Sequence, residues 1–179
     1  MAKQLELAHE IVPTATVIAA LVNPNNPQTE TLLRDLEAAA RILGVQLHVL
    51  RASAEREFDA AFATLVQLRA GALVISTDTF FGSHSEQLAG LTLRHAVPAV
   101  NVDRPFVAAG GLMSYGGSTP EGYHIAGVYA GRILKGDKPS DLPVQQVTKV
   151  ELIINLKTAK SLGLTIPETL LATADEVIQ

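Results

Sequence analysis

Short apolar runs alternate with longer amphipathic segments through residues 1–102, and this alternation limits the possible folds more than any other feature. Four runs have the composition of buried strands, at residues 17–22, 45–50, 71–77 and 97–102. Segments with helical periodicity lie between them, at residues 27–43, 54–69 and 87–95, and another lies at about residues 3–11. Because parallel strands need long crossovers, the pattern predicts an α/β domain: a four-stranded parallel sheet with helices on both faces.

The pattern changes after residue 102. Residues 104–118 contain four glycines, which favours a tight crossing over a regular element. A helix is then predicted over residues 119–134, with Ser118 and Glu121 at capping-box spacing. Residues 143–147 and 150–154 are short strand candidates, and Asn155 is predicted to cap a short helix that ends at Gly163.

Composition excludes several classes of protein. The net charge is −4 and the 14 Lys and Arg residues are scattered, which argues against a nucleic-acid surface. The absence of Cys excludes disulfides and thiolate metal sites. Residues 1–13 do not resemble a secretory signal, and no apolar run is long enough to cross a membrane. Metal-binding, hydrolase and nucleotide-binding motifs are also missing, so we expect no cofactor, no metal and no catalytic residue.

In an open parallel sheet, ligands bind beyond the carboxyl ends of the strands. Four predicted loops lie there, at residues 23–27, 51–54, 77–83 and 102–109. The first is NPNNP, where Asn23 and Asn25 offer side-chain amides and the next helix offers free N–H groups. The alternative is a purely local role, in which Asn26 caps the helix and Asn23 forms a turn.

The other candidates come from two of these loops. Asp78, between Thr77 and Thr79 and followed by Phe80, is a carboxylate beside aromatic rings and could hold an ammonium group. It could equally be a turn residue with the ring packed beneath the helix. Asp103 and Arg104 precede the glycine-rich crossing, where they could contact a ligand, form a hinge or simply be solvated. Aromatic residues are weaker candidates, because they more often lie in a core: Phe80, Phe81, Phe106 and Tyr115.

Several segments together resemble a known family. They are "LVNPNNP", "AAARILGVQLHVL", "FDAAFATLVQLRAGALVIS", "FVAAGGLMSYGGS", "GRILKGDKPSDLPVQQ" and "ELIINLKTAKSLGLTIPETLLATADEVI". Over nearly the whole chain the sequence is similar to ABC transporter substrate-binding proteins of the tryptophan/tyrosine-binding kind. The resemblance implies the type I periplasmic binding protein fold, in which two α/β lobes joined by three crossings close on a small molecule. It also brings Ser114 and Tyr115, within "GGLMSYG", into the candidate ligand site.

The resemblance implies a division of the chain. Residues 1–104 would form the second α/β lobe, a three-layer parallel-sheet unit of the flavodoxin-like or Rossmann-like kind. Residues 105–150 would hold a hinge crossing and a remnant of the first lobe, so that this second lobe of the fold is only partial, and residues 151–179 would return to pack on the α/β lobe. The match is to the second half of the usual chain, so the first lobe and leader would have no counterpart here.

The function implied is that of the solute-binding component of an ABC-type import system. Such a protein binds a small organic solute without chemistry, here an amino acid with an aromatic one as the first candidate. It would be periplasmic or extracytoplasmic and would dock on a permease. Two alternatives stay open: an effector-binding sensor domain, or, with less support, an α/β enzyme. The broad apolar surface of helix 119–134 further predicts a homo-oligomer in which residues 105–150 pack on another chain.

Overall fold

The computed structural model describes residues 1–145 and 149–179, and its strands form one sheet in the order β2-β1-β3-β4-β5-β6-β7. Neighbouring strands are parallel, except that β5 and β6 are antiparallel. The strands are β1 (Val17–Val22), β2 (Gln46–Arg51), β3 (Ala72–Ile75), β4 (Ala99–Asn101), β5 (Met113–Gly117), β6 (Val150–Asn155) and β7 (Glu176–Ile178).

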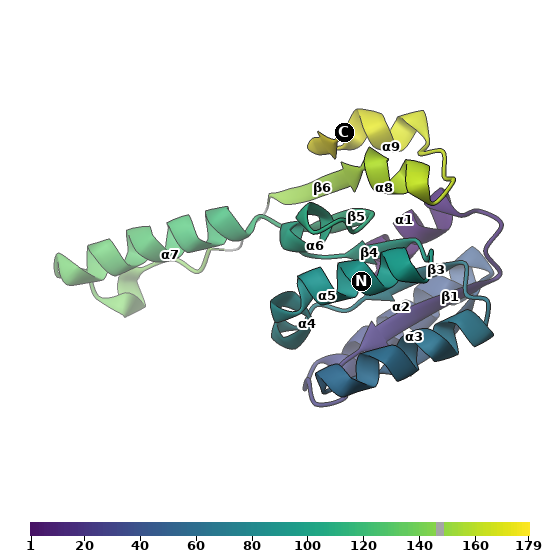
Figure 1. The fold of residues 1–179 in the computed structure, drawn as a ribbon. Coiled ribbons are helices and arrows are strands. Elements are labelled where there is room, and N and C mark those ends of the chain that lie inside the picture. The colour runs from purple at the N-terminus through teal and green to yellow at the C-terminus, as the bar shows by residue number, and fades with distance from the viewer. Residues whose placement is uncertain (146–148) are drawn as a thin grey trace.

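Helices cover both faces of the sheet (Figure 1). The first face packs against α1 (Ala2–Ile11), α2 (Thr29–Leu43), α8 (Leu156–Ser161) and α9 (Glu168–Thr173). The second face packs against α3 (Phe58–Gln67), α4 (Thr79–Ser83), α5 (Ser85–Arg94) and α6 (Arg104–Ala108). Alternate residues of one strand serve the two cores: Ile18 and Ala20 of β1 lie in the first, and Ala19 and Leu21 in the second.

The predicted parallel sheet with helices on both faces is confirmed, with shifted strand ends. The third strand ends at Ile75, so that Ser76 and Thr77 belong to the following loop. The sheet also contains β5, within the segment predicted as a crossing, and β7, which was not predicted. The strand predicted over residues 143–147 is absent over 143–145, and its remaining residues lie outside the described part of the chain.

Two predicted helix starts are shifted. Asn26 was expected to cap a helix over residues 27–43, but α2 begins at Thr29. The Asn26 side chain still has a local role, because its oxygen accepts from the backbone N–H of Gln28, and its amide also donates to the Asp78 carboxylate. The helix predicted over residues 87–95 is α5, which begins earlier, at Ser85, and a separate short helix, α4, precedes it and is capped by Asp78, which accepts from the backbone N–H of Phe80. By contrast, the predicted cap at Asn155 is confirmed.

Helix α7 (Thr119–Leu134) projects away from the sheet (Figure 1). Its large apolar side chains are exposed, including Tyr123 at 76% and Leu134 at 87%. The predicted uncovered surface of this helix is therefore present in the chain. Residues 105–117 belong to the main domain, because β5 pairs with β4 in the sheet and α6 packs on it. Within the 105–150 segment, α7 is the helix that extends away from this sheet. The division at residues 104 and 150 stays a prediction.

Candidate functional site

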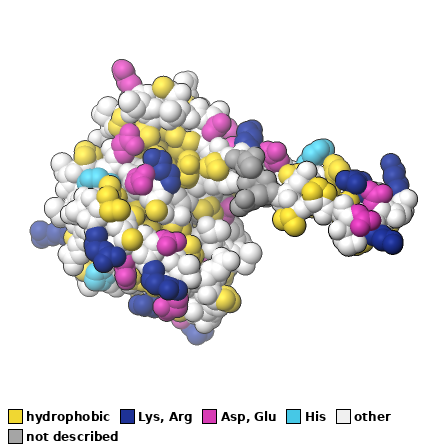
Figure 2. Space-filling model, turned by 180° about the vertical axis from the view of Figure 1, so that it is seen from behind, with side chains coloured by type: hydrophobic (Ala, Val, Ile, Leu, Met, Phe, Trp, Pro, Cys, Tyr) yellow, Lys and Arg dark blue, Asp and Glu magenta, His cyan; other side chains and the backbone are white. Residues whose placement is uncertain are grey.

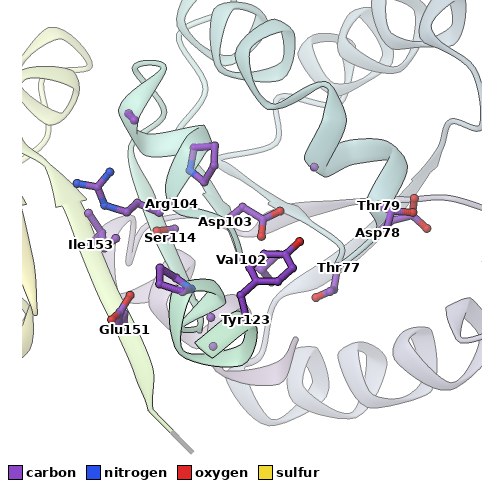
Figure 3. A pocket seen from close by; sticks show the side chains of 16 residues that line it. Thr77, Asp78, Thr79, Val102, Asp103, Arg104, Ser114, Tyr123, Glu151 and Ile153 are labelled. Carbon is purple, nitrogen blue, oxygen red and sulfur yellow. The ribbon is translucent and has the colours of Figure 1, made fainter. Parts of the chain in front are cut away.

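A cavity of about 950 Å³ lies at the carboxyl ends of β3 and β4 (Figure 3). Its wall combines the loops that follow these strands with β5, the start of α7 and one side of β6. The residues that line it include Thr77, Asp78, Val102, Asp103, Arg104, Pro105, Ser114, Tyr123, Glu151 and Ile153. This is the position expected for a ligand site in an open parallel sheet.

The Asp78 carboxylate ties two of the predicted loops together. One oxygen accepts from the Asn23 amide at 3.2 Å and from the backbone N–H of Phe80 at 2.8 Å. The other accepts from the Asn26 amide at 2.7 Å. Three hydrogen bonds leave little free acceptor capacity on this carboxylate. Asp78 lines the cavity, but its three hydrogen bonds join the loop at residues 23–27 to the loop at residues 77–83 and cap α4.

Asp103 differs from Asp78 because its carboxylate has no side-chain partner among the residues that the structure describes. It is half-buried and lies at the N-cap position of α6, yet it makes no capping bond. Within residues 1–145 and 149–179 its side chain forms no hydrogen bond or ion pair with another side chain. Burial raises the pKa of the Asp103 carboxyl above its ordinary value. A desolvated carboxylate without a partner is suited to a cationic group of a ligand.

Arg104 points away from its neighbour, toward Ile153 and β6, whereas Asp103 points into the cavity (Figure 3). The guanidinium pairs with Glu176 of β7 through two hydrogen bonds, of 3.1 Å from Nε and 2.7 Å from Nη2. Similarly, Glu151 of the cavity wall pairs with Lys149 at 2.9 Å. Two of the charges at the cavity are thus already neutralised by the protein.

The predicted site residues fall into three groups. Thr77, Asp78, Asp103, Arg104 and Ser114 meet at the cavity. Tyr115 lines a smaller adjoining cavity of about 430 Å³, which shares Asp103 with the first.

The third group lies outside the cavity wall. Asn23 reaches the site only through its bond to Asp78, and Asn25 is exposed, with its backbone N–H bonded to the Asn23 side chain. Phe80 packs against His84 and Phe58, with ring centroids 4.6 and 5.4 Å apart. The predicted rim loop 51–54 follows β2, the edge strand, and contributes nothing to the wall.

Sequence reasoning missed the wall residues of β6 and α7, which are Glu151, Ile153 and Tyr123. The hydrophobic run at residues 150–154 predicted a strand but not its antiparallel place beside β5. The apolar side chains of α7 were predicted to pack on another chain. Tyr123, one of them, instead lines the ligand-sized cavity.

Gly116 is required where β5 passes the end of β4. A Cβ at this position would overlap with the backbone carbonyl of Val102, which cannot turn aside as a side chain could. We expect Gly116→Ala to lower the free energy of unfolding by about 1–3 kcal/mol, the usual cost of overpacking. Urea denaturation measures this change. Gly131→Ala in α7 is the matched control, because a Cβ there meets nothing within 4 Å. It should be neutral or stabilising, and equal effects of the two substitutions would contradict the overlap.

Within the described residues, no three His, Asp or Glu side chains are placed to hold a metal ion. In the same part of the chain, none of the helices has the length and apolarity to cross a membrane.

The mostly parallel sheet and the cavity at its carboxyl edge define an α/β domain of the ligand-binding type. The chain belongs to the family described as ABC transporter substrate binding protein, whose model matches residues 1–178. It is 24% identical over 162 residues to a tyrosine-binding protein of Clostridioides difficile (strain R20291), covering 90% of this chain and 47% of that protein.

Solved structures agree with this membership. A conserved domain protein from Vibrio cholerae is 25% identical, with a TM-score of 0.86, and the match covers 98% of this chain and 59% of that one. A domain from Streptococcus pneumonia in complex with L-Trp is 25% identical, with a TM-score of 0.85, covering 99% and 61%. The chain thus spans about half the length of the curated relative and about three-fifths of these structures. The fold is that of a periplasmic binding protein domain, as predicted.

Proposed function

We propose that this chain is the solute-binding part of an ABC-type import system and binds a small organic solute in the cavity beside Asp103. The observation that carries the proposal is the half-buried Asp103 carboxylate, which faces a ligand-sized cavity and has no side-chain partner in the described part of the chain. A purely structural carboxylate at an N-cap would bond to the helix N–H groups, and this one does not.

An amino acid is the proposed ligand class, and an aromatic one is the first candidate. The wall offers a carboxylate for an ammonium group, and Val102, Pro105 and Ile153 offer apolar surface for a side chain. Tyr123 adds an aromatic ring to the cavity wall (Figure 3). The names of two relatives, a tyrosine-binding protein and a domain in complex with L-Trp, support the same class.

Binding without chemistry is part of this proposal. Among the described residues of the wall, the hydroxyls of Thr77 and Ser114 have no histidine beside them to act as a base. Family membership further supports a permease partner and an extracytoplasmic location. Closure of a second lobe over the cavity would then couple binding to docking.

A two-step experiment tests the proposed function. Native mass spectrometry of the purified protein would show any retained small molecule. Titration with L-tryptophan and L-tyrosine, followed by ¹H–¹⁵N correlation spectra, should then give saturable shifts at Thr77, Asp103, Ser114 and Gly116. Shifts that do not saturate, or that lie away from these residues, would contradict a binding role for the cavity.

We also propose a homo-oligomer in which α7 packs on another chain. Figure 2 shows apolar side chains along the projecting helix, and the exposed ones include Tyr123, Val128, Ile133 and Leu134. An uncovered apolar surface of this kind usually finds a partner. Light scattering behind a sizing column should therefore show a dimer or larger assembly at micromolar concentration.

Two charged residues on α7 should separate the chains. We expect the double substitution Val128→Asp and Leu134→Asp to shift the protein to a monomer. The double substitution Ile42→Asp and Val66→Asp is the matched control, because these side chains are apolar and 86% and 48% exposed but lie on α2 and α3. A wild-type monomer, or dissociation by both variants alike, would rule out α7 as the contact.

A further inference from the structure

The smaller cavity, of about 430 Å³, adjoins the larger one along a common wall. Five residues line both cavities: Thr77, Val102, Asp103, Gly116 and Gly117. The smaller cavity also has the first turn of α1 and Tyr115 of β5 in its wall. A ligand with one end in each cavity would therefore pass beside Asp103.

The charged side chains of the smaller cavity have opposite signs. They are Lys3 of α1 and Asp103. Within residues 1–145 and 149–179 they form no ion pair with each other, because the Lys3 ammonium donates to Glu6 at 3.0 Å and Asp103 has no side-chain partner. The exposed bond to Glu6 uses one of three ammonium N–H groups, so Lys3 can still donate to a ligand. A separate cation and carboxylate at one small cavity match the two charges of an amino-acid zwitterion.

The first turn of α1 adds donors beside Lys3. The first N–H groups of a helix have no partner within the helix, and the helix dipole places partial positive charge there. In α1 the N-cap residue Met1 makes no side-chain capping bond, and the first turn has no acidic side chain. The hydrogen bond to Glu6 raises the pKa of Lys3 above its ordinary value, and the nearby Tyr115 acts in the same direction. Lys3 is therefore charged at neutral pH and lies near the tyrosine, whose hydroxyl is a further donor.

Gln4 supplies a second acceptor for an ammonium group. It is only 2% exposed, and its amide nitrogen donates to the backbone carbonyl of Tyr115 at 2.9 Å, which holds α1 against β5. The side-chain oxygen of Gln4 has no partner among the described residues. A buried acceptor without a donor is costly, and Gln4 lines the smaller cavity, so a ligand ammonium would satisfy it there. With three N–H groups, one ammonium can donate to Gln4 and Asp103 together.

We propose that the smaller cavity binds the charged head of a free amino acid, with the ammonium group at Asp103 and Gln4 and the carboxylate at Lys3. The first-turn N–H groups of α1 and the Tyr115 hydroxyl complete the carboxylate site. The side chain of the amino acid extends past Asp103 into the larger cavity. The inference rests on the proposed solute-binding function and narrows its ligand class to free α-amino acids, as opposed to aromatic amines or carboxylic acids. Lys3 is the residue that determines this specificity.

Two analogues of L-tryptophan isolate the two charges. Tryptamine lacks the carboxylate and indole-3-propionate lacks the ammonium group, whereas all three share the indole ring. In the same NMR titration, wild-type protein should bind L-tryptophan at least about fivefold more tightly than either analogue, because each analogue loses charge-assisted hydrogen bonds. L-tryptophan should also give saturable shifts at Lys3 and Tyr115.

Lys3→Gln tests the carboxylate site. The ratio of the affinity for L-tryptophan to that for tryptamine should fall by about threefold to fivefold, the scale of an exposed ion pair. Lys160→Gln is the matched control, because it removes the same charge from an exposed position on α8 that lines neither cavity, and it should leave the ratio unchanged. Tyr115→Phe removes only a hydroxyl and should lower the ratio by about twofold to fivefold.

Arg104→Gln examines the other cation at these cavities, and it should leave the ratio unchanged. Equal binding of L-tryptophan and tryptamine by wild-type protein would overturn the inference, as would an unchanged ratio in Lys3→Gln. A ratio that falls in Arg104→Gln and not in Lys3→Gln would place the carboxylate in the larger cavity and would overturn it too. In each of these cases saturable binding, and so the proposed function, would stand. Absence of saturable binding by all three ligands would instead refute the proposed function, and this inference with it.

Discussion

Replacing Phe106 by alanine is expected to lower the free energy of unfolding by about 3–5 kcal/mol. The Phe106 ring is fully buried, and it packs so closely on Gly111 that a Cβ at that glycine would overlap with it. The sheet beneath is rigid, so the space left by the ring would not collapse, and contacts around it would be lost. Urea denaturation of the two proteins measures the difference.

The same substitution should weaken ligand binding, because α6 depends on this ring. The helix spans only Arg104–Ala108, and its buried side chains are Phe106 and Val107. Asp103 is its N-cap residue and Arg104 its first residue, and both line the cavity. Phe106→Leu should lose less stability, whereas Ile42→Ala, at an exposed position, should change it by about 0.5 kcal/mol or less. A loss below about 1 kcal/mol in Phe106→Ala would show that the ring does not anchor the helix.

The central strands could be predicted because each is buried on both faces. β1 and β3 consist of apolar residues throughout, and the helices between them have clear apolar faces. β5 could not be predicted in the same way, since its sequence MSYGG has two glycines and no periodicity. β7 has only three residues, and it exists because β6 offers it an edge. Its pairing depends on tertiary structure rather than on local propensity.

The site could be predicted in part, by the rule that ligands bind beyond the carboxyl ends of parallel strands. That rule placed Asp78 and Asp103 at one edge. It could not show that Asp103 and Arg104, adjacent in the sequence, would diverge. Asp103 has extended backbone angles, φ −103° and ψ 131°, and Arg104 is the first residue of a helix, so their side chains leave in different directions. Nor could it show which way Phe80 faces, because α4 is too short for its periodicity to be read from the sequence.

Asp103→Asn is expected to weaken binding of an ammonium-bearing ligand by at least about tenfold, because it removes a charge-assisted hydrogen bond. Asparagine keeps the shape of the side chain and removes only its charge. The substitution is cleaner than Asp78→Ala, which would also break the hydrogen bonds from Asn23 and Asn26 and so loosen two loops. Titration with L-tryptophan and tryptamine measures the loss.

The pH dependence of stability should show that Asp103 serves binding at a cost to the fold. Burial raises the pKa of its carboxyl in the folded state, so the unfolded chain loses this proton first as pH rises above the ordinary value of about 3.9. Folding then becomes less favourable as pH rises from the ordinary to the raised pKa, and above the raised pKa the full cost of burying the charged Asp103 carboxylate remains.

Asp103→Asn has no such loss, so its stability relative to wild type should increase between about pH 3.5 and pH 7. Asp35→Asn, an equal charge change at an exposed position on α2, is the control for the change in net charge. Weaker binding together with unchanged or greater stability at neutral pH is the result expected of a ligand-binding carboxylate. If Asp103→Asn instead lowered stability at neutral pH and left binding intact, the carboxylate would be a structural group and the cavity would lose its proposed receptor for the ammonium.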